Sequence, residues 1–200
     1  MWANEQLDKS AELTATLPLP VISVVAGKFL AGFLVLLMAL AFTVPFPVTV
    51  AFLGEPDFMR MRAGYLALAL MLGLFFAISL FAAVLVRNQV GGVVVGLGIL
   101  FVLMLMGWDV FTNLLKGILA PEAIETLSLY SPRTWLLRMG DGSVELGAIV
   151  YFVAGTGVAL TGTGIIISKQ SALFHLRKPA VGLGAFSIFF LLALVVPLAN

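Results

Sequence analysis

The stretch AGYLALALMLGLFFAISLFAAVLV, residues 63–86, contains no charged side chain and decides the fold class. A helix needs about 20 predominantly apolar residues, each rising about 1.5 Å, to cross the hydrocarbon core of a bilayer. Lipid offers no hydrogen bonds, so each backbone N–H and C=O group must be paired within the segment, as it is in a helix. The alternating stretches of a membrane β-barrel do not occur in the sequence. We therefore predict a transmembrane helix at 63–86.

Uncharged runs of similar length lie on both sides of this stretch, and each is long enough to cross a bilayer as a helix. The sequence therefore predicts an all-α, polytopic transmembrane helical bundle of about five spanning helices. A cytoplasmic amphipathic helix near the N-terminus and an interfacial helix at about 110–119 accompany them. The predicted spans cover about 21–44, 63–86, 90–108, 146–168 and 180–198.

The composition of the whole chain agrees with lipid as its solvent. Of its 200 residues, 62% are hydrophobic and 10% are charged, with a mean hydropathy of +1.14. A soluble domain carries roughly a quarter charged residues and under half apolar ones. The net charge of +1 indicates no nucleic acid among the partners. The chain has no cysteine, which excludes disulfides, thiolate metal sites and cysteine nucleophiles.

Residues 110–119 show the pattern of an amphipathic helix between two of the spans. Thr112, Asn113 and Lys116 share one face. The other face is apolar and consists of Val110, Phe111, Leu114, Leu115, Ile118 and Leu119. Such a helix lies in the interface plane of the membrane.

Several side chains are suited to the headgroup region at the ends of the spans. Trp108 marks the exit of one span, and the segment YSPRTW, residues 130–135, adds Tyr130 and Trp135 as interfacial aromatics. Lys28 lies near the start of the first span, from which it can extend to the headgroups as an anchor.

The sequence lacks the residues that an enzyme or an ion-driven transporter would use. His175, the single histidine, lies in a polar connector, where we interpret it as a solvated side chain. No phosphate-binding loop or catalytic motif occurs, so we expect no enzymatic activity, cofactor or metal, and no ATP hydrolysis by this chain. The spans carry no acidic residue or histidine, which argues against proton- or sodium-coupled transport.

Small residues are frequent in two spans. Gly92 and Gly96 form a GxxxG pair, and Gly155 and Gly162 belong to a glycine-rich span at 146–168. Small residues let membrane helices approach closely. We expect these four glycines to mediate helix packing within the bundle, with a contact to a second chain as the alternative.

The charge distribution orients the bundle only weakly. Basic residues expected on the N-terminal side are Lys9, Lys28, Arg87, Lys169, Arg177 and Lys178. Those expected on the opposite side are Arg60, Arg62, Lys116, Arg133 and Arg138. The positive-inside rule then favours a cytoplasmic N-terminus by six basic residues against five.

Three segments resemble the type-2 ABC transporter permeases, especially those of the gliding-motility and nitrous-oxide-reductase-maturation types. They are NEQLDKSAELTATLPLPVISVVAGKFLAGF (4–33), LVRNQ (85–89) and LYSPRTWLLRMGDGSVELGAIVYF (129–152). The residues of the first that match the family pattern are Glu12, Leu13, Thr16, Pro18, Gly27, Lys28 and Phe29. Gln6 and Leu7 replace the family's basic pair, and Lys9 replaces its glycine.

The resemblance implies a role for the amphipathic segment at 1–19. In that family a cytoplasmic coupling helix at this place docks on a separate ATP-binding subunit, which supplies the energy for export. The residues that would make this contact are Glu5, Lys9, Glu12, Leu13, Thr16 and Leu17. An interfacial anchor is the alternative interpretation of the same segment. The partners implied are this ATP-binding subunit, a second permease copy or homologue, and the lipid of a bacterial inner (plasma) membrane.

The family has six spans, and this chain begins where the third would start. We therefore expect a coupling-like segment at 1–19, a permease domain at 20–170, and a connector with a further span at 171–200. The last span resembles the opening of an extracytoplasmic auxiliary subunit, which makes the chain a fragment of a fused permease. Two other functions stay open at this point, a non-transporting membrane anchor or assembly subunit and an ion-coupled secondary transporter.

Overall fold

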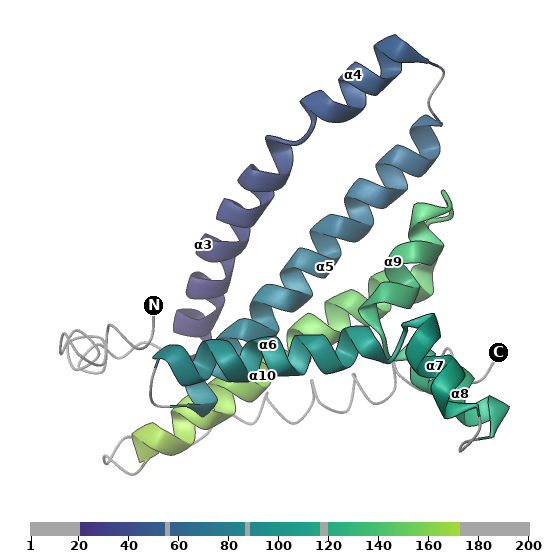
Figure 1. Ribbon diagram of the computed structural model, residues 1–200. Helices are drawn as coiled ribbons and strands as arrows, with labels where there is room; N and C mark the ends of the chain where they lie inside the picture. Colours follow the sequence, from purple (N-terminus) through teal and green to yellow (C-terminus); the bar gives the residue numbers. More distant parts are fainter. Residues whose placement is uncertain (1–20, 55–56, 87–88, 117–119, 173–200) are drawn as a thin grey trace.

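The computed structural model describes residues 21–54, 57–86, 89–116 and 120–172, and these form helices joined by short connections, without strands (Figure 1). This confirms the all-α prediction for the described residues. The predicted coupling segment at 1–19 and the span at 180–198 lie outside them. The helices are α3 (Val21–Ala41), α4 (Pro45–Leu53), α5 (Phe58–Leu85), α6 (Gln89–Leu105), α7 (Asp109–Leu115), α8 (Pro121–Leu129), α9 (Pro132–Gly140) and α10 (Leu146–Ala172).

Three helical stretches are long and apolar enough to cross a membrane, namely Val21–Leu53, Phe58–Leu85 and Leu146–Ser168. A fourth crossing results if the segments Val90–Leu105 and Asp109–Leu115, which meet at an angle of 70°, count as one bent span. The chain is therefore a membrane-embedded helical protein with three to four spans among its described residues. Each of these spans overlaps one that the sequence predicts.

Helix α5 begins at Phe58, before the predicted span at 63–86. The Asp57 side chain accepts hydrogen bonds from the backbone N–H groups of Met59 and Arg60, at 3.0 and 3.3 Å. An aspartate at this position pairs N–H groups that would otherwise have no acceptor in the first turn of a helix. Arg60 and Arg62 consequently lie in the first two turns of α5.

The helix of the first predicted span is interrupted just before PFP, residues 45–47. Helix α3 ends at Ala41, residues 42–44 form a turn, and α4 begins at Pro45, where a missing N–H costs nothing. Tyr65 of α5 donates its hydroxyl proton to the carbonyl of Thr43 at 3.1 Å. The turn is thereby held to the neighbouring helix by a hydrogen bond, which matters where lipid offers no other donor.

The spans alternate in direction, as their side-chain contacts show. The ring of Phe33 in α3 faces Gly73 in α5, and the ring of Phe76 faces Gly32, so α3 and α5 are antiparallel. Gly92 and Gly96 of α6 lie beside the last turns of α5, so this pair is antiparallel too. Figure 1 shows α10 running beside α5 in the same direction.

This alternation defines two ends of the bundle. One end, which we call the entry end, lies at the left in Figure 1. It contains the start of α3, the residues on either side of the α5–α6 connection and the last turns of α10. The opposite end, which we call the cleft end, contains the start of α5 and helices α7, α8 and α9. Gly142, with φ of 96°, reverses the chain from α9 toward α10 beside Arg60 of α5.

Helix α5 is the centre of the bundle and packs against α10, α6, α9 and α3. The buried core combines small residues with a few large ones, and the small ones let the helix axes approach closely. Its fully or nearly fully buried members are Ala67, Leu74, Ala77, Ile78, Trp135, Met139, Ala148, Phe152 and Ala159.

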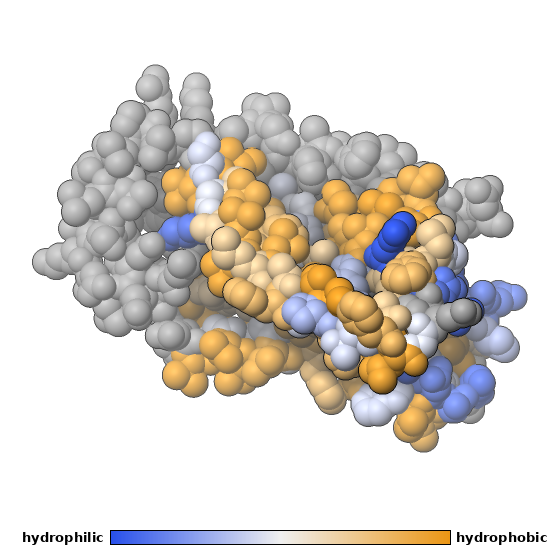
Figure 2. Space-filling model, turned by 90° about the horizontal axis from the view of Figure 1, so that it is seen from above, coloured by the Kyte–Doolittle hydropathy of each residue, from blue (hydrophilic) through white to orange (hydrophobic). Residues whose placement is uncertain are grey.

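The outer surface of α3, α4 and α6 is apolar. Phe42 and Phe52 are 84% and 88% exposed, and Leu97 of α6 is 64% exposed. Figure 2 shows hydrophobic residues over most of the coloured surface, and most of the hydrophilic ones lie at its right-hand side. Such a surface is stable in lipid or against another apolar helix, and unfavourable in water.

Candidate functional site

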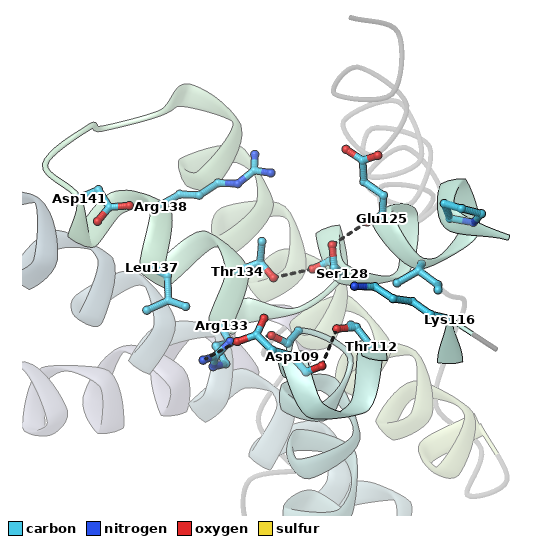
Figure 3. A pocket seen from close by; sticks show the side chains of 13 residues that line it. Asp109, Thr112, Lys116, Glu125, Ser128, Arg133, Thr134, Leu137, Arg138 and Asp141 are labelled. Atoms are coloured by element: carbon cyan, nitrogen blue, oxygen red, sulfur yellow. Dashed lines mark hydrogen bonds and ion pairs between the residues drawn. The ribbon is translucent and has the colours of Figure 1, made fainter. Parts of the chain in front are cut away.

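A cleft of about 620 Å³ lies at the cleft end, between α7, α8 and α9 (Figure 3). Three basic and three acidic side chains line it together with three hydroxyl groups. The charged residues are Asp109, Lys116, Glu125, Arg133, Arg138 and Asp141, and the hydroxyl residues are Thr112, Ser128 and Thr134. The cleft therefore gathers charged and hydroxyl side chains at one end of a protein whose described spans expose a largely apolar surface.

The bend at the end of α6 forms one wall of the cleft. Helix α6 ends at Leu105, and Trp108 adopts an extended conformation before α7 begins. The Arg133 guanidinium of α9 donates a hydrogen bond to the carbonyl of Gly107 at 2.7 Å, and a second nitrogen lies 3.8 Å from the Asp109 carboxylate. Arg133 thus pairs a carbonyl at the end of α6, where helices leave such groups without partners.

The turn between α8 and α9 forms the opposite wall. Helix α9 begins at Pro132, and the buried Ser131 side chain accepts a hydrogen bond from the backbone N–H of Arg133 at 3.3 Å. The Thr134 hydroxyl donates to the carbonyl of Ser128 at 2.8 Å. The Ser131 bond caps the first turn of α9, and the Thr134 bond ties α9 to α8.

Trp135 anchors α9 to the core. It is 4% exposed, its indole N–H donates to the carbonyl of Leu129 at 2.7 Å, and its ring lies 5.8 Å from that of Tyr151 in α10. The Tyr151 hydroxyl donates to the carbonyl of Tyr130 at 2.5 Å. The expectation that Trp135 is an interfacial aromatic is thus corrected, because its ring and its N–H find partners inside the protein. Trp108, at 48% exposed, keeps an outward position.

The charges at the cleft fall into two groups. Arg133 is paired with Asp109, and Arg138 lies 3.9 Å from Glu145 and 5.1 Å from the centre of the Trp135 ring. Lys116, Glu125 and Asp141 form no ion pair within the described part of the chain. No group of three or more His, Asp or Glu side chains among the described residues is arranged to hold a metal ion. The cleft therefore presents charges of both signs that remain available to a ligand.

No known protein family, curated protein or solved structure matches this chain. The site consequently has to be interpreted from its own chemistry. Sequence reasoning missed the cleft because its residues come from separate helices along 107–141. The one available signal was the polar face predicted for 110–119, of which Thr112 and Lys116 line the cleft.

The residues predicted to contact an ATP-binding subunit, Glu5 to Leu17, lie outside the described residues. The four predicted packing glycines all lie beside α5. A Cβ at Gly92 would lie 3.2 Å from the Cα of Ala83, and one at Gly96 would lie 3.4 Å from the Cβ of Ala82. A Cβ at Gly155 or Gly162 would lie 2.9 Å from the side chain of Leu74 or Phe81, respectively.

Replacing Gly92 by valine should separate α6 from α5, because the added methyl groups would meet backbone atoms of Ala83, which cannot move aside as a side chain can. Overpacking of this kind costs about 1–3 kcal/mol. We expect a lower midpoint of thermal unfolding in detergent. Gly98→Val in the same helix is the matched control, because nothing lies within 4 Å of its Cβ position. Equal midpoints for the two variants would contradict this packing.

Proposed function

We propose that this chain is the membrane-spanning permease subunit of an ATP-driven ABC exporter in a bacterial inner membrane. A separate ATP-binding subunit would hydrolyse the nucleotide, and the segment at 5–17 would transmit its movement to α3. A second copy or a homologue of the chain would complete the translocation pathway, and an extracytoplasmic auxiliary subunit is the further partner that the C-terminal span suggests.

The alternation of the spans is the observation that carries this proposal. It brings the start of α3 and the residues that flank the α5–α6 connection to the entry end. These are two of the places where the sequence resembles the permeases, and in that family both face the cytoplasm. A single partner at the entry end would therefore reach the segment before α3 and the connection beside Leu85 at the same time.

The charges of the described spans favour an energy source outside the bundle. No Asp or Glu occurs in α3, α4, α5 or α6, and the basic residues of α5 lie in its first two turns. Ion-coupled transporters usually keep acidic residues at the membrane midplane as relays or ligands. Hydrolysis by a partner needs no such group.

The exposed apolar surface of α3 and α6 supports a second chain as a further partner. Many large apolar side chains of these helices are exposed, among them Leu34, Met38 and Phe101, which are 57%, 65% and 60% exposed. A second copy would cover part of this surface, and lipid would cover the rest. A contact between this chain and a second copy or homologue is therefore part of the proposal.

Purification of the tagged full chain from bacterial membranes tests the coupling role. We expect the purified material to hydrolyse ATP and to contain a subunit that a photoreactive ATP analogue labels. Deleting residues 5–17 should reduce this co-purifying ATPase activity at least about tenfold, the change that a loss of about 1.4 kcal/mol in binding produces. Glu122→Lys, which changes a carboxylate at the cleft end, is the control and should retain the activity.

Other outcomes distinguish the rival functions. Unchanged ATPase activity after the deletion would contradict the coupling role. Uptake or efflux that an ion gradient drives in vesicles without ATP would identify a secondary transporter. An absence of any labelled partner and of any flux would identify an anchor or assembly subunit.

A further inference from the structure

The hydroxyl groups of the cleft can only accept hydrogen bonds. Thr112, Ser128 and Thr134 donate their protons to the carbonyls of Asp109, Glu125 and Ser128, at 3.1, 2.7 and 2.8 Å. A hydroxyl group has one proton and two lone pairs, so each of these oxygens keeps only acceptor capacity toward the cleft. The cleft therefore suits a ligand that brings several N–H donors.

The unpaired charges add two requirements for the ligand. Glu125 and Asp141 have no ion pair among the described residues and favour a cationic group. Lys116 has none either and favours an anionic group, while the partly exposed Arg133, which is paired with Asp109, can add further N–H donors (Figure 3). A small ligand that satisfies both carries an ammonium and an anion a few atoms apart.

The position of the cleft shows from where such a ligand comes. The cleft lies where α6 ends, next to the half-exposed Trp108, at the depth where aromatic side chains meet headgroups. In α7, Val110 and Leu114 are 61% and 70% exposed, as in a helix that rests on a membrane surface. Phe101 and Val102, 60% and 51% exposed in the last turns of α6, offer apolar surface to acyl chains in the helix that leads to the cleft.

We infer that the cleft binds the headgroup of a phospholipid that carries a primary ammonium and a phosphate, as in phosphatidylethanolamine. The ammonium donates to the hydroxyl oxygens and to Glu125, and the phosphate accepts from Lys116 and Arg133. A choline headgroup has the same charges without N–H donors, and a glycerol headgroup has no cation. The N–H donors and the charges of the headgroup thus determine which class of phospholipid the cleft binds.

Binding of short-chain lipids to the full chain in detergent, followed by native mass spectrometry, tests this inference. We expect the ethanolamine lipid to bind at least about tenfold more tightly than the choline or glycerol lipid, as the loss of charge-assisted hydrogen bonds implies. Equal binding of the three lipids would overturn the inference. Soluble phosphoethanolamine that binds as tightly as the lipid would overturn the membrane as its source.

Two variants locate the site. Lys116→Ala and Glu125→Gln should each weaken binding of the ethanolamine lipid about tenfold, and Glu125→Gln should also reduce its preference over the choline lipid. Glu122→Gln in the same helix as Glu125 and Arg62→Gln at the same end of the bundle are matched controls, since neither residue lines the cleft.

Unchanged thermal unfolding midpoints establish that the variants are folded. Equal losses in the variants and the controls, or no loss in either, would overturn the site. The measurement involves no nucleotide and no flux, so its result is independent of the proposed transport function.

Discussion

Replacing Gly107 by alanine is expected to lower the free energy of unfolding by about 2–3 kcal/mol, the cost of overpacking together with a lost helix cap. A Cβ at Gly107 would overlap the Ser131 hydroxyl and would lie 2.6 Å from the Cβ of Ser131 and 2.8 Å from the Thr134 hydroxyl. Ser131 is fully buried and cannot move away without giving up its bond to the N–H of Arg133. One added methyl group thus disturbs the bend, the start of α9 and the cleft together.

The thermal unfolding midpoint in detergent measures this effect. For a chain of this size we expect a decrease of roughly 5–10 °C. Gly98→Ala is the matched control in the same region of the chain, because its Cβ position has nothing within 4 Å. Alanine is the better helix former by about 1 kcal/mol, so the control should be as stable as the parent or slightly more so. A Gly107 variant that behaves like the Gly98 control would show that the bend tolerates a side chain.

Replacing Trp135 by alanine is expected to have the largest effect of any single substitution considered for this protein. Truncation of a buried aromatic side chain costs about 3–5 kcal/mol. The carbonyl of Leu129 would also lose its donor, which adds about 1–3 kcal/mol where water cannot replace it. The ring contacts with Tyr151 and with the guanidinium of Arg138 would be lost as well.

The same unfolding experiment, with two further variants, separates these contributions. Trp135→Phe retains most of the ring packing and loses the N–H donor, so its midpoint should lie between those of the parent and the alanine variant. Trp108→Ala removes an indole that is 48% exposed and should change the free energy of unfolding by about 1 kcal/mol or less. If Trp108→Ala proved as destabilising as Trp135→Ala, the core position of Trp135 would be wrong.

The spans are the part of the fold that composition predicts well. Residues 63–86, 21–44 and 146–168 fall within α5, α3 with its following turn, and α10. Their boundaries were less predictable, because they depend on single side chains. Asp57 starts α5 several residues before the uncharged run, and the turn at 42–44 interrupts a helix that resumes at Pro45.

That lipid is the solvent of this protein, and that helices cross it, can be predicted from the sequence alone. Both follow from the residues of each segment alone, because the cost of a charge or an unpaired backbone group in hydrocarbon does not depend on which helix lies nearby. The amphipathic face at 110–119 is readable for the same reason, since its period is a property of one helix.

The contacts of individual side chains, by contrast, depend on how the helices pack. The sequence around Trp135 predicts an aromatic side chain at the membrane interface. In the structure, a hydrogen bond to the carbonyl of Leu129 and contact with the ring of Tyr151 hold Trp135 in the core. The bond from Arg133 to Gly107 joins residues that no local pattern relates. The cleft exists because α7, α8 and α9 meet at the end of α6, and the acceptor character of its hydroxyl groups depends on which carbonyls they reach after packing.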